Sequence, residues 1–139
     1  MSWDADLVAV CDCGHLHCGI DGAPIGQWNY THNTGIMLAD ALDRAGIERV
    51  SLPGSRWDQW RIDRRVTGPA SWWEVLDSRT GLDGARILHA TIRGLEADPA
   101  HYRAMNPDNR WGSYETLLPL LREMRDAPGE QPSVWKVSG

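Results

Sequence analysis

The spacing of apolar side chains along the chain predicts strands near both ends. Residues 7–11 form a short apolar run rich in valine, which is typical of a strand, and residues 15–20 either extend it or form another strand. A turn signal at 21–24 separates this part from a returning strand at 25–30, so we expect a hairpin. Residues 133–137 predict a closing strand that pairs with the hairpin.

Between these strands, apolar residues recur at helical spacing. The clearest stripe follows Asp83 and contains Ile87, Leu88, Ile92 and Leu95. The predicted helices are 35–45, 71–76, one from Asp83, a short one after Asp98-Pro99, and a last one capped by Ser113. The pattern therefore predicts an α+β fold. Its small antiparallel sheet, the N-terminal hairpin plus the C-terminal strand, is covered on one face by about four helices.

Two segments allow more than one interpretation. Residues 48–69 contain several glycines and prolines with Trp57 and Trp60 between them, and they predict a long loop, with or without one turn of helix. Pro119 falls inside the last predicted helix, where a proline removes a backbone hydrogen bond and costs roughly 3 kcal/mol. That helix therefore either kinks at Pro119 or begins later than Ser113 indicates.

Composition and length narrow the class of protein. The chain has 139 residues, of which 42% are hydrophobic and 24% charged, so we expect one domain, residues 1–139, with one core. No apolar run reaches the roughly 18 residues of a membrane span, and the acidic N-terminus lacks the basic start of a secretion signal. Three clustered cysteines make a poor disulfide framework. We therefore expect a soluble, cytoplasmic protein without a membrane partner.

A cluster of cysteine and histidine residues suggests a metal site. The possible zinc ligands are Cys11, Cys13, His15, His17 and Cys18. Zinc prefers four such ligands in a tetrahedron at about 2.0–2.3 Å, but the usual paired spacing is missing. On a straight strand, residues 11 and 17 lie about 20 Å apart, so a zinc site requires a sharp bend at Gly14. Alternatively, the cysteines pack as small apolar side chains and the histidines face solvent.

Two segments dense in asparagine and aromatic residues each lead into a predicted helix. They are WNYTHN at 28–33 and MNPDNRWGSY at 105–114. Helix N-termini offer unpaired N–H groups, asparagine both donates and accepts, and Trp and Tyr supply flat walls, so the two segments together suit a small polar ligand. The candidate ligand-binding residues are Asn29, Tyr30, Thr31, His32, Asn33, Asn106, Asn109, Trp111, Gly112 and Tyr114. The alternative is a purely structural role as helix caps and packing residues.

These segments also carry a resemblance. Residues 29–33 and 106–114 resemble the patterns N-[YI]-T-[HSY]-N and N-P-x-N-x-W-G-[SD]-Y of a family of small uncharacterised bacterial and phage proteins. The resemblance covers roughly residues 26–139, and it implies no catalytic residues because the family carries no established activity. For a phage protein it implies inhibition of host defence, for example by sequestering a nucleotide signal.

The sequence favours a small binding module over an enzyme, because it contains no nucleophile elbow, phosphate loop or dinucleotide fingerprint. The net charge of −5 disfavours nucleic acid as a partner. A small polar ligand is one expected partner, and a protein that contacts a basic, tryptophan-rich stretch is another. That stretch contains Arg56, Trp57, Trp60, Arg61, Arg64 and Arg65. Two alternatives stay open: a zinc-binding structural or interaction protein, and a small enzyme with His32 as its base.

Overall fold

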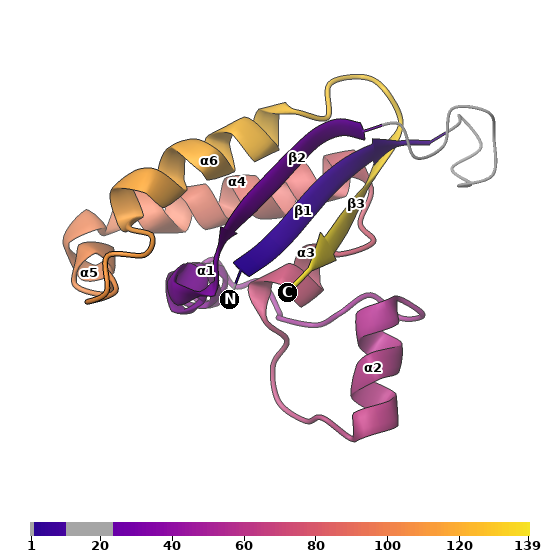
Figure 1. The fold of residues 1–139 in the computed structure, drawn as a ribbon, viewed down its shortest axis with the longest axis horizontal. Helices are drawn as coiled ribbons and strands as arrows, with labels where there is room; N and C mark the ends of the chain where they lie inside the picture. Colours follow the sequence, from indigo (N-terminus) through magenta and orange to yellow (C-terminus); the bar gives the residue numbers. More distant parts are fainter. Residues whose placement is uncertain (1, 11–23) are drawn as a thin grey trace.

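The computed structural model describes residues 2–10 and 24–139, and this part of the chain contains one three-stranded antiparallel sheet (Figure 1). In the order β2-β1-β3, the sheet consists of β1 (Ser2–Ala9), β2 (Pro24–Thr31) and β3 (Ser133–Ser138). The predicted returning strand and its pairing with the first strand are confirmed, as is the pairing of the C-terminal strand with β1. The segment 15–20, predicted as a strand or an extension of one, lies outside the described residues.

Six α-helices and one 3₁₀-helix accompany these strands in the described ranges. They are η1 (His32–Thr34), α1 (Gly35–Arg44), α2 (Arg56–Arg64), α3 (Trp72–Leu76), α4 (Gly81–Ala97), α5 (Pro99–Arg103) and α6 (Tyr114–Asp126). The α+β prediction is confirmed, with more helices than expected. None of these helices has both the length and the apolar character that crossing a membrane requires.

The helix ends follow the capping signals in the sequence. Asp98 Oδ1 accepts a hydrogen bond from His101 N at 3.3 Å at the start of α5, and Ser113 Oγ accepts one from Thr116 N at 3.2 Å at the start of α6. α6 begins directly after Ser113 and continues through Pro119. The alternative of a later start is therefore wrong.

The two faces of the sheet differ in polarity. Trp3, Ala5 and Leu7 of β1 are fully buried, whereas Asp4 between them is exposed. Alternate side chains of a strand point to opposite faces, so this pattern indicates a sheet that is covered on one side. In Figure 1, α4 passes behind the sheet, and α6, which packs against α4, runs beside β2.

The core fills the space between this inner sheet face and the helices. Its largest fully buried side chains include Trp3, Trp72, Trp135, Tyr102, Leu88 and Leu95. Fully burying one such apolar side chain stabilises a fold by roughly 1.5–3 kcal/mol. Gly84 lets α4 approach β3 closely, because a Cβ at that position would overlap the ring of Trp135. The predicted stripe from Ile87 to Leu95 is buried on the same helix.

The helix α2 is an exception, because none of its residues is buried. Ser55 caps it by accepting a hydrogen bond from Asp58 N at 3.2 Å, and Arg65 ends it in a left-handed conformation with φ 53°. Figure 1 shows α2 apart from the sheet and the other helices. The prediction of a loop with at most one helical turn over 48–69 is therefore wrong for α2, which has nine residues. No apolar stripe marked this helix because no face of it enters the core.

Neighbouring segments occupy the outer edge of β3. The backbone of Trp135 exchanges two hydrogen bonds with residues 78–79, each 2.8 Å long. The N–H of Val137 donates to Asp77 Oδ1 at 2.7 Å, and its carbonyl accepts two bonds from side chains of α2. The backbone polar groups that an edge strand leaves unpaired are thus satisfied at these two positions.

Candidate functional site

The two asparagine-rich segments lie side by side. Asn33 Nδ2 donates to Asn109 Oδ1 and to the Trp111 carbonyl, each over 3.4 Å. Asn109 Oδ1 also accepts from Trp111 N at 3.0 Å, and Asn106 Oδ1 accepts from Tyr114 N at 2.8 Å. These asparagines therefore join the start of α1 to the loop before α6. We term this contact, made by residues 30–34 with residues 106–114, the asparagine corner.

The asparagine corner is closely packed. The Tyr30 hydroxyl contacts Thr116 Oγ1 and accepts a hydrogen bond from Ser113 N at 3.3 Å. Gly112 has φ 84°, and a Cβ there would overlap the Thr31 methyl group. Only glycine meets both conditions without strain. The corner thus behaves as a joint between two segments, with its polar atoms directed at one another.

Other predicted residues take different positions. Asn29 lies on the outer face of the sheet, where its Nδ2 donates to Ser2 Oγ at 3.1 Å. His32 turns towards α3 and stacks on Trp73, with ring centroids 4.5 Å apart and planes 6° from parallel. Trp111 is 65% exposed at the corner. Ligand binding by the asparagine corner stays a prediction.

The predicted zinc ligands, Cys11, Cys13, His15, His17 and Cys18, lie outside the described residues. In residues 2–10 and 24–139, no group of three or more His, Cys, Asp and Glu side chains is arranged to hold a metal ion. The zinc hypothesis therefore stays a prediction.

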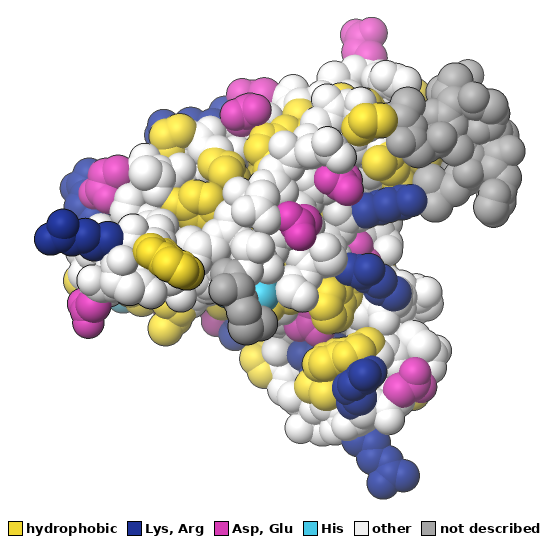
Figure 2. Space-filling view, viewed as in Figure 1, with side chains coloured by type: hydrophobic (Ala, Val, Ile, Leu, Met, Phe, Trp, Pro, Cys, Tyr) yellow, Lys and Arg dark blue, Asp and Glu magenta, His cyan; other side chains and the backbone are white. Residues whose placement is uncertain are grey.

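A hollow lined by aromatic side chains lies between α2 and the body of the protein. Trp57 and Trp60 come from α2, Trp73 from α3 and His32 from η1. The hollow has a volume of about 480 Å³, which falls within the roughly 300–1,000 Å³ of pockets for small molecules. We term it the aromatic hollow. In Figure 2, the α2 region forms a lobe of its own below the body, with hydrophobic and basic side chains next to one another.

The α2 rings of the aromatic hollow are held by specific contacts. Trp57 and Trp60 pack edge to face, with centroids 5.8 Å apart and planes at 75°. Trp57 Nε1 donates to the Val137 carbonyl at 2.9 Å. The guanidinium groups of Arg56 and Arg64 lie over the rings of Trp57 and Trp60, at 5.1 and 5.2 Å. Such cation–π contacts contribute about 0.5–1 kcal/mol at exposed sites, so the rings are oriented before any ligand arrives.

A buried ion pair connects α2 to α3 beside these rings. Arg61 Nε lies 3.0 Å from Glu74 Oε1, and the two side chains are only 14% and 7% exposed. The other Arg61 nitrogens donate to the carbonyls of Gly68 and Pro69, at 3.3 and 2.9 Å. Glu74 Oε2 accepts from the backbone and hydroxyl of Ser71. The charges of Arg61 and Glu74 therefore compensate each other next to the hollow.

His32 completes the aromatic wall as a neutral ring. Burial lowers the pKa of His32 below its ordinary value, because a buried imidazole loses the hydration that stabilises its charged form. Its Nε2 atom is covered and has no hydrogen-bond partner among the described residues. At neutral pH the side chain therefore contributes a flat, uncharged surface stacked on Trp73.

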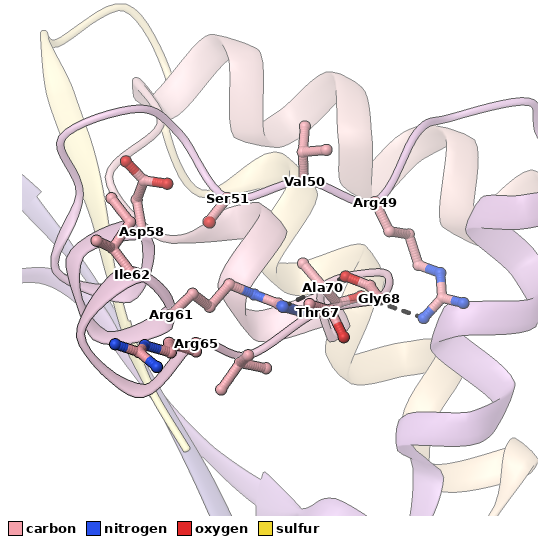
Figure 3. Close-up of a pocket in the computed structure, with 11 residues that line it drawn as sticks. Arg49, Val50, Ser51, Asp58, Arg61, Ile62, Arg65, Thr67, Gly68 and Ala70 are labelled. Carbon is pink, nitrogen blue, oxygen red and sulfur yellow. Dashed lines mark hydrogen bonds between the residues drawn. The ribbon is translucent and has the colours of Figure 1, made fainter.

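A second hollow lies against a neighbouring face of α2 (Figure 3). Its volume is about 430 Å³, and it is lined by Val50, Ile62 and Val66, by Ala70 at its base and by Arg65 at its rim. Figure 3 shows residues 49–51 along one side and α2 along the other. We term it the aliphatic hollow.

The sequence pointed to only part of these two hollows. Trp57, Trp60 and Arg61 belong to the stretch predicted as a protein-binding surface, and His32 was a predicted ligand-binding residue. Glu74 was missed as a partner of Arg61, although its position three residues after Ser71 matches a capping box. That motif predicts the local contact of Glu74 with Ser71 and says nothing about a partner thirteen residues away.

Comparison of the chain with protein-family models, with curated proteins and with solved structures found no match in any of the three, so the resemblance of residues 26–139 to small bacterial and phage proteins stays a prediction.

Proposed function

We propose that the chain is a small binding module that holds a planar, uncharged ring in the aromatic hollow. One observation carries this proposal: four ring side chains from three elements, Trp57, Trp60, Trp73 and His32, line a single hollow. Stacking of a flat ring on such a side chain contributes about 1–3 kcal/mol. Because the rings are oriented in advance, little ordering is needed when the ligand enters.

The electrostatics of the hollow support an uncharged ring over a charged ligand. Arg49 and Arg61 line the hollow and disfavour a cation. Both are already paired, Arg49 with Asp43 at 2.8 Å and Arg61 with Glu74, so they also offer an anion little unused charge. A heterocycle such as a nucleobase has the right shape and polarity, so of a nucleotide only the base, and not the charged phosphate, falls within the proposed ligand class.

The small-enzyme alternative gains no support from the surroundings of His32. Ser71, which also lines the hollow, offers a hydroxyl as a candidate nucleophile. This hydroxyl donates a hydrogen bond to Glu74 Oε2 at 2.7 Å as part of a helix cap. The imidazole stacks on Trp73, and its buried Nε2 atom has no hydrogen-bond partner among the described residues. A general base needs a positioned proton donor within hydrogen-bond reach, and none is arranged here in the described part of the chain.

A ligand screen read by tryptophan fluorescence tests the proposal. Free nucleobases, nucleosides, indole and quinoline would be titrated into the chain, with glucose and inorganic phosphate as non-planar controls. We expect saturable quenching and a raised melting temperature with at least one planar compound. Saturation with the non-planar compounds alone would contradict the proposal, as would a flat response to every planar ring.

A matched pair of tryptophan variants locates the site. Trp60→Ala removes one wall of the aromatic hollow and should weaken binding roughly 5- to 150-fold, the equivalent of one lost stacking contact. Trp111→Ala removes an exposed tryptophan that does not line the hollow and should leave binding unchanged. The opposite result, with only Trp111→Ala losing affinity, would move the site to the asparagine corner.

A further inference from the structure

Three exposed aliphatic side chains gather at the aliphatic hollow. Val50, Ile62 and Val66 are 46%, 62% and 37% exposed, and all three line the same hollow (Figure 3). Single exposed aliphatic residues are ordinary on a protein surface, but several around one concave site mark an interaction surface. α2 buries no residue of its own, so packing within the fold does not explain why Ile62 is apolar.

The base of the aliphatic hollow is rigid. Ala70 N donates to the Arg49 carbonyl at 2.9 Å, and the Arg49 guanidinium donates to the Ala70 carbonyl at 3.1 Å. Arg49 is fixed in turn by two hydrogen bonds to Asp43, of 2.8 and 3.2 Å. A partner therefore meets a preformed surface and needs to order only its own side chains.

The rim of the hollow has one uncompensated positive charge. Arg49 and Arg61 are paired with Asp43 and Glu74, and the carboxylate of Asp58 accepts from Gly54 N at 2.9 Å. Arg65 is exposed at the rim and forms no ion pair within the described residues. An acidic group on the partner would complement it, because opposite charges at an interface rim steer association and fix orientation.

We term residues 56–65, which contain α2, the α2 arm. Its charge argues against a second copy of this chain as the occupant of the aliphatic hollow. Residues 56–65 contain four arginines and two aspartates, although the chain as a whole has net charge −5. A symmetric dimer places the same patch of each copy against the other. Pairing through α2 would thus bring two basic arms together, whereas an acidic segment of another protein is attracted to this arm.

We propose that the aliphatic hollow docks a short segment of a partner protein that presents a branched aliphatic side chain next to an acidic one. The aliphatic side chain enters between Val50, Ile62 and Val66, and the carboxylate reaches Arg65. This surface goes beyond the ring-binding function. Val66 lines both hollows, but Val50, Ile62 and Arg65 line the aliphatic hollow and not the aromatic one, and none of the four rings belongs to the aliphatic hollow.

Selection from a library of random octapeptides displayed on phage, with the full chain immobilised, tests the docking proposal. We expect the enriched peptides to share Ile, Leu or Val within two positions of Asp or Glu. A synthetic copy of the most enriched peptide should then bind in solution, measured by fluorescence anisotropy. Failure to enrich any peptide, or enrichment of peptides without an acidic residue, would overturn the proposal.

Two isoleucine variants supply the matched control. Ile62→Glu places a negative charge in the hollow and should weaken the selected peptide by at least about tenfold. Ile36→Glu changes an isoleucine of nearly equal exposure, 64%, that does not line the hollow, and should leave peptide binding unchanged. Equal effects of the two variants would remove the hollow as the docking site. Circular dichroism of both variants establishes that they fold.

Two further measurements test the docking proposal: peptide selection with a charge-reversed Arg65, and the oligomeric state of the chain. Arg65→Glu should shift the selected peptides from acidic to basic residues beside the aliphatic one. A wild-type dimer in sedimentation analysis that Ile62→Glu converts to a monomer would overturn the partner proposal in favour of self-association. Ring binding by Ile62→Glu should persist, so failure of the docking surface is distinguishable from failure of the proposed function.

Discussion

The asparagine corner and the α2 arm both concentrate aromatic and polar side chains, but they use them differently. At the corner, Asn33 Nδ2 donates to Asn109 Oδ1 and to the Trp111 carbonyl, and Asn109 Oδ1 also accepts from Trp111 N. On the arm, single contacts such as Trp57 Nε1 to the Val137 carbonyl orient the rings beside open space. From this difference we expect ligand binding where ring side chains line open space rather than where polar side-chain atoms pair with one another.

The largest expected effect tests how tightly the corner is closed. Gly112→Ala adds a methyl group at φ 84° that overlaps Thr31, and it should lower the free energy of unfolding by about 2–4 kcal/mol. Gly54→Ala is the control, because Gly54 has a similar φ of 80° but open space around its Cβ. It should cost only about 1–2 kcal/mol. Equal urea midpoints for the two variants would mean that the corner is loosely packed.

The next effect concerns the attachment of the arm. Glu74→Gln removes the charge that compensates Arg61 and should cost about 2–3 kcal/mol, less than for a fully isolated ion because two carbonyls still accept from Arg61. Hydrogen exchange should accelerate in α2 and stay unchanged at the corner. Glu115→Gln breaks an exposed pair with Arg103 and serves as the control, with little change expected. Uniform acceleration over the whole chain would contradict an independently attached arm.

Removing a ring of the arm should affect stability less. Trp60→Ala leaves the core untouched, since no residue of α2 is buried, and should change the free energy of unfolding by less than about 1 kcal/mol. Urea unfolding followed by circular dichroism measures it. A loss as large as that of Gly112→Ala would show that the ring has a structural role like that of the corner.

The smallest effect is the pH dependence of His32. Its pKa is lowered in the folded protein, so the unfolded chain binds more protons once the pH falls below the ordinary histidine value near 6.5. His32 therefore favours folding above that pH, and this contribution declines as the pH falls towards the folded pKa. His32→Phe keeps a flat ring on Trp73 and should lose less stability between pH 7.5 and pH 5.5 than the wild type. An unchanged loss of stability in His32→Phe over this pH range would contradict the contribution of His32.

The sheet and the main helices were predictable from the sequence because each buries one of its faces in the core. The stripe from Ile87 to Leu95 is spaced for a helix and is buried on one, and Ser113 marks the start of α6 through its own side chain. Burial and capping are local properties, so they leave a trace at fixed spacing in the sequence. Gly112 was named only as part of the candidate ligand-binding segment 105–114, and its role in close packing is visible only in three dimensions.

The hollows were not predictable by the same means. α2 has no buried face, so it lacks the period that marks a helix, and its cap at Ser55 is a weak signal alone. The pair of Arg61 with Glu74 and the stack of His32 on Trp73 join residues distant in sequence. Such contacts depend on how elements are placed in space, and one sequence contains no spacing rule for them.

The occupied edge of β3 limits how the protein can assemble with itself. A sheet extends from copy to copy only through strands whose backbone groups remain unused. The backbone N–H and C=O groups of Trp135 and Val137 already form hydrogen bonds with residues 77–79 and with α2. Among the described strands, a further strand could therefore pair only with the outer edge of β2. Growth through β2 alone would end after a single pairing, so sheet extension through the described strands should give a closed pair of copies rather than a fibre.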